Sequence, residues 1–325
     1  MRLLYLDSMK GILIFLVILG HAIQFTLQGY EDNFMFKFIY SFHMPLFLMI
    51  SGYLTYRREH DNRMISKRAK QCLVPFITWA FALPLLEGQI DFERSWQILQ
   101  YPDKGLWFLY HIFIYSAIFN ISEEWSKKWG QELLVVIFVI ACYIGMILFG
   151  TWFNFTQLCW HIPFFALGYY VHKYDNLPVF TPLWTVIWGG IYVMAFGCLN
   201  WEMALFPKMY GLSYLLNYMV ELTGALFFYS LGRKFLNRRV YFVDEMGKMT
   251  LGIYAFQFVV LYWLGLVLDC NEILKIILEA FLCTLICFWI VRLLQKTKWI
   301  KAFMIGDFSN VIKKKNNENI RQNFA

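Results

Sequence analysis

Two side chains that can exchange protons interrupt the first apolar stretch of the chain, residues 6–28. Lys10 and His21 lie eleven positions apart, and at about 100° per residue they share one face of a helix, about 20° beyond three full turns. The helical rise between them is about 16 Å, so the lysine would lie near one membrane surface and the histidine inside the bilayer. A charge at mid-bilayer costs about 2.5–3.5 kcal/mol on insertion scales. This polar stripe therefore indicates either a reactive site or helix packing beside a lysine that reaches the surface.

A second histidine, His43, lies in the next apolar stretch, residues 34–56, two positions before Pro45. A proline inside a helix frees a backbone carbonyl, so we expect a bend at this depth. Because the first stretch would run outward and the second would return, His21 and His43 should lie at comparable heights. A single membrane histidine is typical of a hydrogen bond between helices. Two at one depth, one of them beside a bend, favour a functional site.

The composition of the chain is that of a polytopic membrane protein. Of its 325 residues, 59% are hydrophobic, 20% aromatic and only 16% charged, whereas soluble domains have about 25% charged residues. The net charge of +7 could indicate a nucleic-acid partner, but the basic residues cluster in loops between apolar stretches, which is typical of membrane orientation. The seven cysteines lack the spacing of metal ligands, so we expect neither a metal site nor a disulfide framework.

About ten apolar segments have the length of a membrane-spanning helix. We therefore predict an all-α fold, a polytopic bundle of about ten transmembrane helices, in a membrane domain of residues 1–295. Residues 296–325 are predicted to be a basic, polar cytoplasmic tail, because their last part is rich in asparagine and lysine. The expected spans are residues 6–28, 34–56, 71–87, 105–121, 132–150, 156–173, 183–200, 212–231, 250–268 and 273–294.

Basic residues are abundant in every second loop and scarce in the loops between. The positive-inside rule therefore predicts that both termini are cytoplasmic, which agrees with an even number of spans. We expect a multi-pass protein of the cell inner (plasma) membrane. The predicted cytoplasmic side holds Arg57, Arg58, Arg63, Lys67, Arg68, Lys70, Arg233, Lys234, Arg238, Arg239, Lys248, Lys296, Lys298, Lys301, Lys313, Lys314 and Lys315, and the opposite loops hold Arg94, Lys104 and Lys208.

Six short patterns follow one another along nearly the whole chain. They are Lys10–Ile12 with Val17–His21, then Phe42–Tyr53, Arg68–Phe76, Leu106–Leu109, His161–Tyr169 and Gly247–Tyr254. In this order they resemble the acyltransferase-3 family of integral membrane acyltransferases, and within it the fucose-4-O-acetylase-like branch of surface sugar O-acetylases. Each pattern alone is a weak signal, whereas six in the right order are specific.

The resemblance implies a reaction in which an acetyl or other short acyl group moves from acyl-CoA, on the cytoplasmic side, to a hydroxyl of a cell-surface or lipid-linked sugar. The family's first-helix pattern is a basic residue, ten others and a histidine, and it maps onto Lys10 and His21. Lysine stands where much of the family has arginine, and it offers a point charge instead of a planar fork, so the role of Lys10 stays open. Asp7 would cap this helix or pair with Lys10, three positions on.

Acyl transfer to an alcohol requires removal of the hydroxyl proton. Imidazole, with an unperturbed pKa of about 6.5, suits this task near neutral pH. His21 is therefore the predicted catalytic residue, either as a general base or as a transient carrier of the acyl group, and the sequence leaves both roles open. His43 would orient a substrate or donate to the developing oxyanion, or else have a purely structural role.

Basic and aromatic residues near the predicted catalytic helices are candidates for substrate contacts. Arg68 and Lys70, with Arg63, would hold the phosphates of acetyl-CoA. Alternatively, this basic cluster only fixes the topology and touches anionic headgroups. His161 would line the cavity for a carbohydrate or glycolipid acceptor, although packing is an alternative reading. The remaining candidates for acceptor contacts are Trp107 and Ser51.

The competing class of function is transport. A secondary transporter or flippase for a sugar or lipid-linked glycan would also have intramembrane histidines and interrupted helices. Transporters often contain an internal repeat, but the stretch from Lys10 to Pro45 has no counterpart in the second half of the chain. No phosphate-binding glycine loop indicates nucleotide hydrolysis either. We therefore favour an enzyme with acetyl-CoA as donor, the lipid bilayer and a sugar acceptor as partners, and no nucleic acid.

Overall fold

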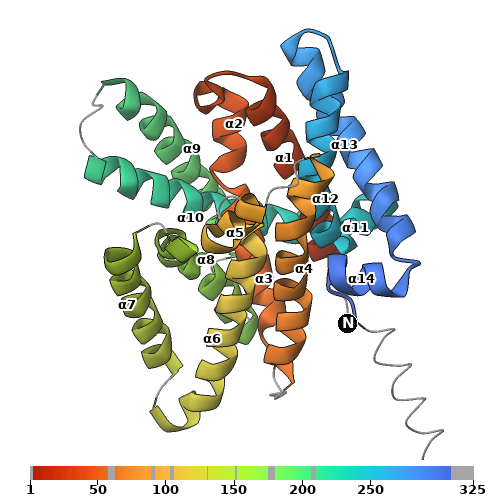
Figure 1. Cartoon of the computed structure of the whole chain (residues 1–325). Helices are drawn as coiled ribbons and strands as arrows, with labels where there is room; N and C mark the ends of the chain where they lie inside the picture. The colour runs from red at the N-terminus through yellow and green to blue at the C-terminus, as the bar shows by residue number, and fades with distance from the viewer. Residues whose placement is uncertain are drawn as a thin grey trace, which may run out of the picture. The chain divides into compact units, whose positions relative to one another are not determined.

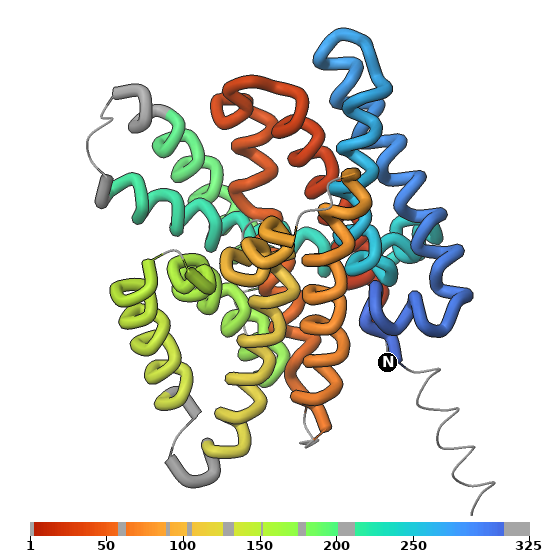
Figure 2. Tube along the Cα trace, viewed as in Figure 1, coloured from red at the N-terminus to blue at the C-terminus, as the bar shows by residue number. Residues whose placement is uncertain are grey.

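The chain folds into a series of helices, as Figure 1 shows for the computed structural model of the protein. The structure describes residues 3–57, 63–88, 92–102, 106–129, 131–150, 152–174, 180–205 and 210–308, without the side chains of 126–129, 131–132, 201–205 and 210–211. These residues form helices and no strand, and Figure 2 follows the Cα trace through them. The α-helices are α1 (Leu4–Thr26), α2 (Phe34–Tyr40), α3 (His43–Thr55), α4 (Met64–Leu86), α5 (Phe92–Gln100), α6 (Trp107–Trp129), α7 (Gln131–Phe149), α8 (Phe155–Lys173), α9 (Pro182–Leu205), α10 (Tyr210–Phe235), α11 (Tyr241–Lys248), α12 (Thr250–Val267), α13 (Glu272–Leu294) and α14 (Lys298–Ile305). Two short 3-10 helices are η1 (Tyr30–Asp32) and η3 (Trp152–Asn154).

Every predicted span coincides with a helix, or with the pair α2 and α3 in the case of residues 34–56. Among the described residues, six segments are long and apolar enough to cross a membrane: α1, the α2–α3 segment, α4, α9, α12 and α13. A shorter apolar helix covers Leu133–Phe149. The fold is therefore an all-α, multi-pass membrane bundle, as predicted. For the helices beyond these six, membrane crossing stays a prediction.

The chain forms two compact units, each assembled from segments that are distant in sequence. Unit 1 comprises Met1–Tyr56, Pro163–Thr250 and Leu264–Thr284. Unit 2 comprises Arg57–Ile162, Leu251–Trp263 and Leu285–Ala325. The expected division of the chain between residues 295 and 296 stays a prediction.

One helix crossing in unit 1 depends on two glycines that face each other's helices, Gly52 of α3 and Gly168 of α8. A Cβ atom on Gly52 would overlap the carbonyl oxygen of Phe165, and a Cβ atom on Gly168 would overlap that of Met49. Glycine is required where two backbones approach this closely. Both glycines lie in patterns that carry the family resemblance, so these patterns contain the contact points of α3 and α8.

A second crossing, between α1 and α11, has the same reciprocal form. Here Gly11 lies against the carbonyl group of Val243, and Gly247 lies against the carbonyl group of Asp7. The glycine that follows Lys10 in the sequence thus brings α11 against the amino-terminal part of α1.

The bend predicted in residues 34–56 is a full break between α2 and α3. α2 ends at Tyr40, and Phe42 has φ −146° and ψ −21°. Pro45 is the third residue of α3, where a missing N–H costs no intrahelical hydrogen bond. Because the proline cannot bond to the carbonyl of Ser41, the helix restarts ahead of it. The bend is confirmed, but it lies a few residues earlier than its proline.

In unit 2, the segment expected to begin the polar tail contains α14, which packs on α4. Nε1 of Trp79 donates a hydrogen bond of 3.0 Å to the carbonyl oxygen of Met304. α14 ends at Ile305 and is followed by Gly306, whose φ is +76° and whose backbone lies against the carbonyl group of Gln71. Residues 309–325, which include Lys313, Lys314 and Lys315, lie outside the described residues.

Candidate active site

His21 lies near the carboxy-terminal end of α1 and begins a chain of three polar side chains in unit 1. Its Nδ1 is 3.2 Å from Oε1 of Gln24, about one turn further along α1. Nε2 of Gln24 donates to the hydroxyl oxygen of Tyr30, in η1, at 3.4 Å. The imidazole also stacks on Phe25, with ring centroids 6.3 Å apart. These neighbours fix the orientation of the ring.

The same contacts define which ring nitrogen of His21 carries the hydrogen. With its NH₂ group directed at Tyr30, the Gln24 amide presents its oxygen to His21, and an amide oxygen can only accept. Nδ1 is therefore the donor in this network. Nε2 then has the lone pair that a general base or a nucleophile needs.

His43 is the first residue of α3 and closes the break after α2. Its Nδ1 donates to the carbonyl oxygen of Ile39 at 2.7 Å, and its ring meets that of Tyr40 edge-on at 4.7 Å. On α1, a Cβ atom at Gly20 would meet the same two residues, Ile39 and Tyr40. Gly20, the residue before His21, and His43 therefore both adjoin Ile39 and Tyr40 of α2. The bond to Ile39 ties the His43 ring to the end of α2, while its role towards a substrate stays a prediction.

Lys10 lies near the amino-terminal end of α1 and pairs with Asp7, with Nζ 2.9 Å from Oδ1. Of the two roles considered for Asp7, the pairing with Lys10 is confirmed and the capping is wrong, because Leu3 occupies the N-cap position. Asp7 is 4% exposed. Its partner Lys10 neutralises a carboxylate that would be costly to bury alone.

A further carboxyl group contacts the same end of α1. Oγ of Ser8 donates to Oδ1 of Asp244, which lies on α11. Asp244 is 1% exposed, and its Oδ2 accepts no hydrogen bond from the described residues. The amino-terminal part of α1 thus contacts two buried acidic groups, Asp7 paired with Lys10 and Asp244 bonded to Ser8.

At the opposite end of α1, a buried carboxylate joins α13 to Thr26. Glu279 is 1% exposed, and its Oε2 accepts a hydrogen bond of 2.9 Å from Oγ1 of Thr26. Nζ of Lys275 lies 4.0 Å from Oε1 of Glu279 and donates to the carbonyl oxygen of Gly265 at 2.9 Å. Charged side chains inside apolar helices are rare and usually functional. Glu279 of α13 is therefore a candidate residue beside the end of α1 that carries His21.

In unit 2, three ring systems from α6 and α8 form a compact cluster. Trp107 stacks on His161 with centroids 5.1 Å and planes 11° apart. The ring of His111 lies 4.8 Å from that of Trp107 and 5.8 Å from that of His161. His111 is fully buried, and among the described residues neither of its ring nitrogens has a hydrogen-bond partner. Because buried polar groups are nearly always hydrogen-bonded, this cluster is a candidate contact site for a bound molecule.

The predicted donor-binding residues lie at the start of α4, also in unit 2. Arg63 precedes the helix and is exposed, as is Lys70. Arg68 is half-buried, and its Nη1 donates to Oε1 of Gln71 at 3.4 Å. Residues 58–62 of the basic loop, including Arg58, lie outside the described residues.

Comparison with known proteins identifies the family. A family model described as an acyltransferase domain matches residues 3–292. The chain belongs to the acyltransferase-3 family. Two curated relatives of this acyltransferase domain are nodulation proteins named NolL. The protein from Sinorhizobium fredii (strain NBRC 101917 / NGR234) is 32% identical over 185 residues, which cover 50% of this chain and 47% of the relative. The protein from Mesorhizobium japonicum (strain LMG 29417 / CECT 9101 / MAFF 303099) is 30% identical over 182 residues, which cover 52% and 47%.

This acyltransferase domain spans about half the length of the curated relatives it matches. No solved structure matches it. Its predicted site residues fall into two sets. Lys10, His21, His43 and Ser51 belong to unit 1, and Arg63, Arg68, Lys70, Trp107 and His161 belong to unit 2.

Within unit 1, His43 and the Gly20 that precedes His21 adjoin one stretch of α2, and Lys10 lies at the other end of α1. Ser51 donates its hydroxyl to the carbonyl oxygen of Phe47 at 2.8 Å, inside α3. Within unit 2, the structure brings Trp107 and His161 into contact. Among the described residues, no three histidine, cysteine or acidic side chains are grouped as a metal ion would require.

Sequence reasoning missed three polar side chains of the acyltransferase domain. Gln24 follows His21 by three positions, the spacing of neighbours on a helix, so the sequence could have predicted their side-chain contact. Glu279 is a carboxylate within an apolar run, and this pattern by itself predicts a functional residue. Asp244 lies between two apolar segments, where an acidic residue carries no signal.

Proposed function

We propose that the chain is a membrane O-acyltransferase that moves an acetyl or other short acyl group from acyl-CoA to a hydroxyl of a cell-surface or lipid-linked sugar. The observation that carries the proposal is the acyltransferase family match over residues 3–292 combined with the oriented imidazole of His21. That ring presents a nitrogen lone pair on a helix that also carries Lys10.

The proposed reaction exchanges a thioester for an ester. The acceptor hydroxyl oxygen attacks the thioester carbonyl carbon, Nε2 of His21 takes the hydroxyl proton, and the C–S bond breaks. The imidazolium then gives this proton to the departing CoA sulfur and returns to its neutral form. In the other route, Nε2 attacks the thioester carbonyl carbon first, the C–S bond breaks and CoA leaves as its thiolate. The sugar hydroxyl oxygen then attacks the acyl carbon, the C–N bond breaks, and the hydroxyl proton passes to the thiolate. In both routes Gln24 keeps the hydrogen on Nδ1.

The remaining candidate residues have supporting roles in the proposal. Arg68 and Lys70, with Arg63, bind the phosphates of the donor, because guanidinium and ammonium groups at a helix entrance form charge-assisted hydrogen bonds with phosphate. Acetyl-CoA is the donor that we propose first. Trp107 and His161 contact the acceptor sugar, and the buried imidazole of His111 lies beside them.

The proposed location is the inner (plasma) membrane, with both termini cytoplasmic. The support is the distribution of charge, since the exposed Arg57, Lys70, Arg238 and Lys296 all fall in loops or helix ends assigned to one side. In this orientation the amino-terminal end of α1, with Lys10, lies at the cytoplasmic surface. His21 then lies within the membrane towards the opposite surface.

A purified, reconstituted protein tests this function directly. We expect it to release free CoA thiol from acetyl-CoA when an acceptor sugar is supplied, and mass spectrometry should find one acetyl group added per acceptor. A transporter would instead move labelled sugar across the vesicle membrane without release of thiol. That second result would overturn the proposal.

A further inference from the structure

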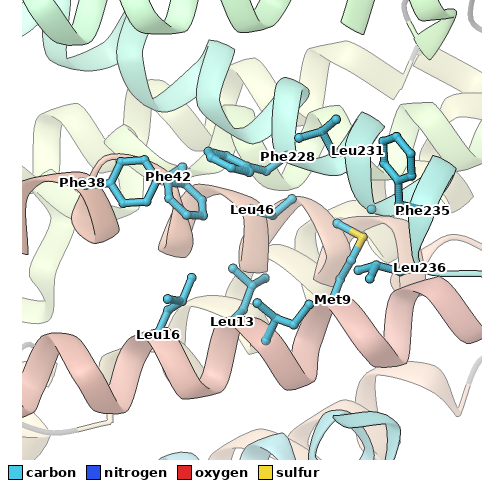
Figure 3. Close-up of a pocket in the computed structure, with 12 residues that line it drawn as sticks. Met9, Leu13, Leu16, Phe38, Phe42, Leu46, Phe228, Leu231, Phe235 and Leu236 are labelled. Carbon is cyan, nitrogen blue, oxygen red and sulfur yellow. The ribbon is translucent and has the colours of Figure 1, made fainter. Parts of the chain in front are cut away.

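Unit 1 contains a cavity whose chemistry differs from that of the polar groups described above. It has a volume of about 310 Å³, is open on one side, and is lined by residues of α1, α2, α3 and α10 together with Phe42 and Leu236. Its lining consists only of methionine, leucine, isoleucine, phenylalanine and one glycine. Figure 3 shows Leu13 and Leu16 of α1 directed towards the side chains of the other helices. A sugar or a CoA phosphate would find no hydrogen-bonding group inside it.

The cavity has a deep part and a mouth. Met9, Phe42 and Leu46 are 3%, 3% and 2% exposed and line its deep part. Ile12 and Phe235 are 41% and 64% exposed and mark its mouth, between α1 and the end of α10. A molecule that enters here would pass the last turn of α10 first.

Water is a poor occupant for this cavity, because a buried water needs two to four polar partners and apolar cavities stay dry. An empty cavity would forgo dispersion contacts along its whole lining. The bilayer supplies an apolar occupant instead, the hydrocarbon chain of a lipid.

The mouth is bordered by basic and aromatic residues. Arg233 and Lys234 precede Phe235 in the last turn of α10, and Arg238 and Arg239 follow it; all four are exposed. Lys234 lies over the ring of Phe235 with Nζ 5.3 Å from the centroid, so one charge sits directly at the mouth. Exposed basic residues beside apolar ones attract anionic headgroups at a membrane surface. The charge outside the cavity therefore complements a negatively charged lipid.

We propose that this cavity binds one acyl chain of an anionic phospholipid from the surrounding bilayer, while the lipid phosphate contacts the basic residues at positions 233–239. The apolar lining selects the chain and the basic cluster selects the headgroup. The proposal is independent of the acyl transfer reaction, because it concerns a bound lipid and not a donor or acceptor.

Native mass spectrometry of the full chain tests the chain-binding part. The protein is reconstituted in nanodiscs with equal amounts of phosphatidylglycerol and phosphatidylcholine and then released into detergent. The wild type should retain phosphatidylglycerol. Leu16→Trp fills the cavity and should lower its retention about tenfold, an effect of the size expected when a few apolar contacts are lost. The control Leu266→Trp adds the same ring at a side chain of unit 1 that is 64% exposed, and it should retain lipid as the wild type does.

A second pair of variants tests the headgroup. Arg238→Gln with Arg239→Gln should lower the preference for phosphatidylglycerol by roughly tenfold to thirtyfold, on the basis of each basic residue's attraction to anionic lipid. The matched control, Lys296→Gln with Lys298→Gln, removes two exposed lysines elsewhere and should leave the preference unchanged.

For the chain-binding test, Leu46→Phe replaces Leu16→Trp if the latter does not elute as a single species. If Leu16→Trp or Leu46→Phe retains as much phosphatidylglycerol as the wild type, the proposal is overturned. Displacement of phosphatidylglycerol by long-chain acyl-CoA or by an isoprenoid phosphate at equal concentration would also overturn it.

Discussion

Oε1 of Gln24 accepts the hydrogen carried by Nδ1 of His21, at 3.2 Å, and this contact decides what His21 can do. With the hydrogen on Nδ1, the lone pair is on Nε2, where a hydroxyl proton or an acyl carbon can be received. The amide group of Gln24 is itself oriented by the hydroxyl of Tyr30. An imidazole that is merely buried between helices does not require a second, oriented partner of this kind.

Replacement of His21 should nearly abolish acyl transfer. An imidazole that acts as base or acyl carrier contributes about 10²–10⁴-fold in rate. His21→Ala and His21→Gln should therefore lose activity to the same extent, although the glutamine can still form hydrogen bonds. Thiol release from acetyl-CoA measures the rate, and size-exclusion chromatography in detergent checks that the variants fold. Near-normal activity of His21→Gln would mean that the histidine is only a hydrogen-bonding group.

Replacement of Gln24 should affect the rate of the chemical step more than substrate binding. Gln24→Leu removes the acceptor for Nδ1, so the imidazole loses its preferred tautomer, and kcat should fall by about tenfold or more, which is part of the 10²–10⁴-fold that a general base typically contributes. Gln24→Glu retains an acceptor oxygen and should keep most of the activity. KM for acetyl-CoA should be similar in both variants. Equal activity of Gln24→Leu and the wild type would show that the tautomer is set by another group.

The sequence predicts contacts that are local along a helix and misses those that join distant segments. The spacing of Lys10 and His21 was sufficient to place both on α1, and Asp7 was correctly considered as the partner of Lys10. The ten helical segments follow from apolar runs, because each run is a property of neighbouring residues. By contrast, the bond from Ser8 to Asp244 joins residues 236 positions apart. No periodicity within either segment contains that information.

The position of the break before His43 shows a similar limit. A proline indicates that a helix is interrupted, but it is equally acceptable in the first turn of a new helix. The sequence therefore predicted a bend around Pro45, whereas the structure begins α3 at His43. The acceptor of the His43 ring, the carbonyl group of Ile39, becomes available only because α2 ends nearby. The sequence offered a structural role for this histidine as one alternative, but its hydrogen-bond acceptor could not be named before the break was located.

Alanine at Gly52 or Gly168 should destabilise the protein markedly. Either Cβ atom would overlap a backbone carbonyl group of the facing helix, so α3 and α8 would have to separate. We expect a loss of about 1–3 kcal/mol for each variant, the usual cost of overpacking a core. Gly190 on α9 is the matched control, because a Cβ atom there has no neighbour within 4 Å. Gly190→Ala should be neutral or stabilising by up to about 1 kcal/mol, since alanine favours helices. Thermal unfolding in detergent micelles measures all three variants, and equal Tm values would contradict the close crossing.

Replacement of Arg68 and Lys70 by glutamine should weaken the binding of acetyl-CoA. Two phosphate contacts are lost, and at about 1.5–3 kcal/mol for each charge-assisted hydrogen bond the effect on Kd should be at least tenfold. The salt dependence of binding should decrease at the same time, because fewer charges are paired. Lys67→Gln, an exposed lysine on the same helix, provides the control and should bind donor normally. An unchanged Kd with unchanged salt dependence would mean that the basic residues only fix the topology.

The bond between Thr26 and Glu279 should behave as a coupled pair. Thr26→Val removes the hydroxyl that donates to a carboxylate only 1% exposed, and a buried acceptor left without its donor costs about 1–3 kcal/mol. Glu279→Leu alone leaves the hydroxyl of Thr26 without this acceptor and should also destabilise the protein. When both side chains become apolar, neither the carboxylate nor the hydroxyl is left unsatisfied, and Lys275 keeps its hydrogen bond to the carbonyl oxygen of Gly265, so the double variant should be nearly as stable as the wild type. Thermal unfolding of the four proteins gives the coupling energy, and a double variant that loses the sum of the two single losses would show that the residues act independently.

Acyl transfer by the double variant separates the two possible uses of Glu279. If the carboxylate only joins α13 to α1, activity should return with stability; if it also binds the acceptor sugar, KM for the sugar should rise while the protein remains folded.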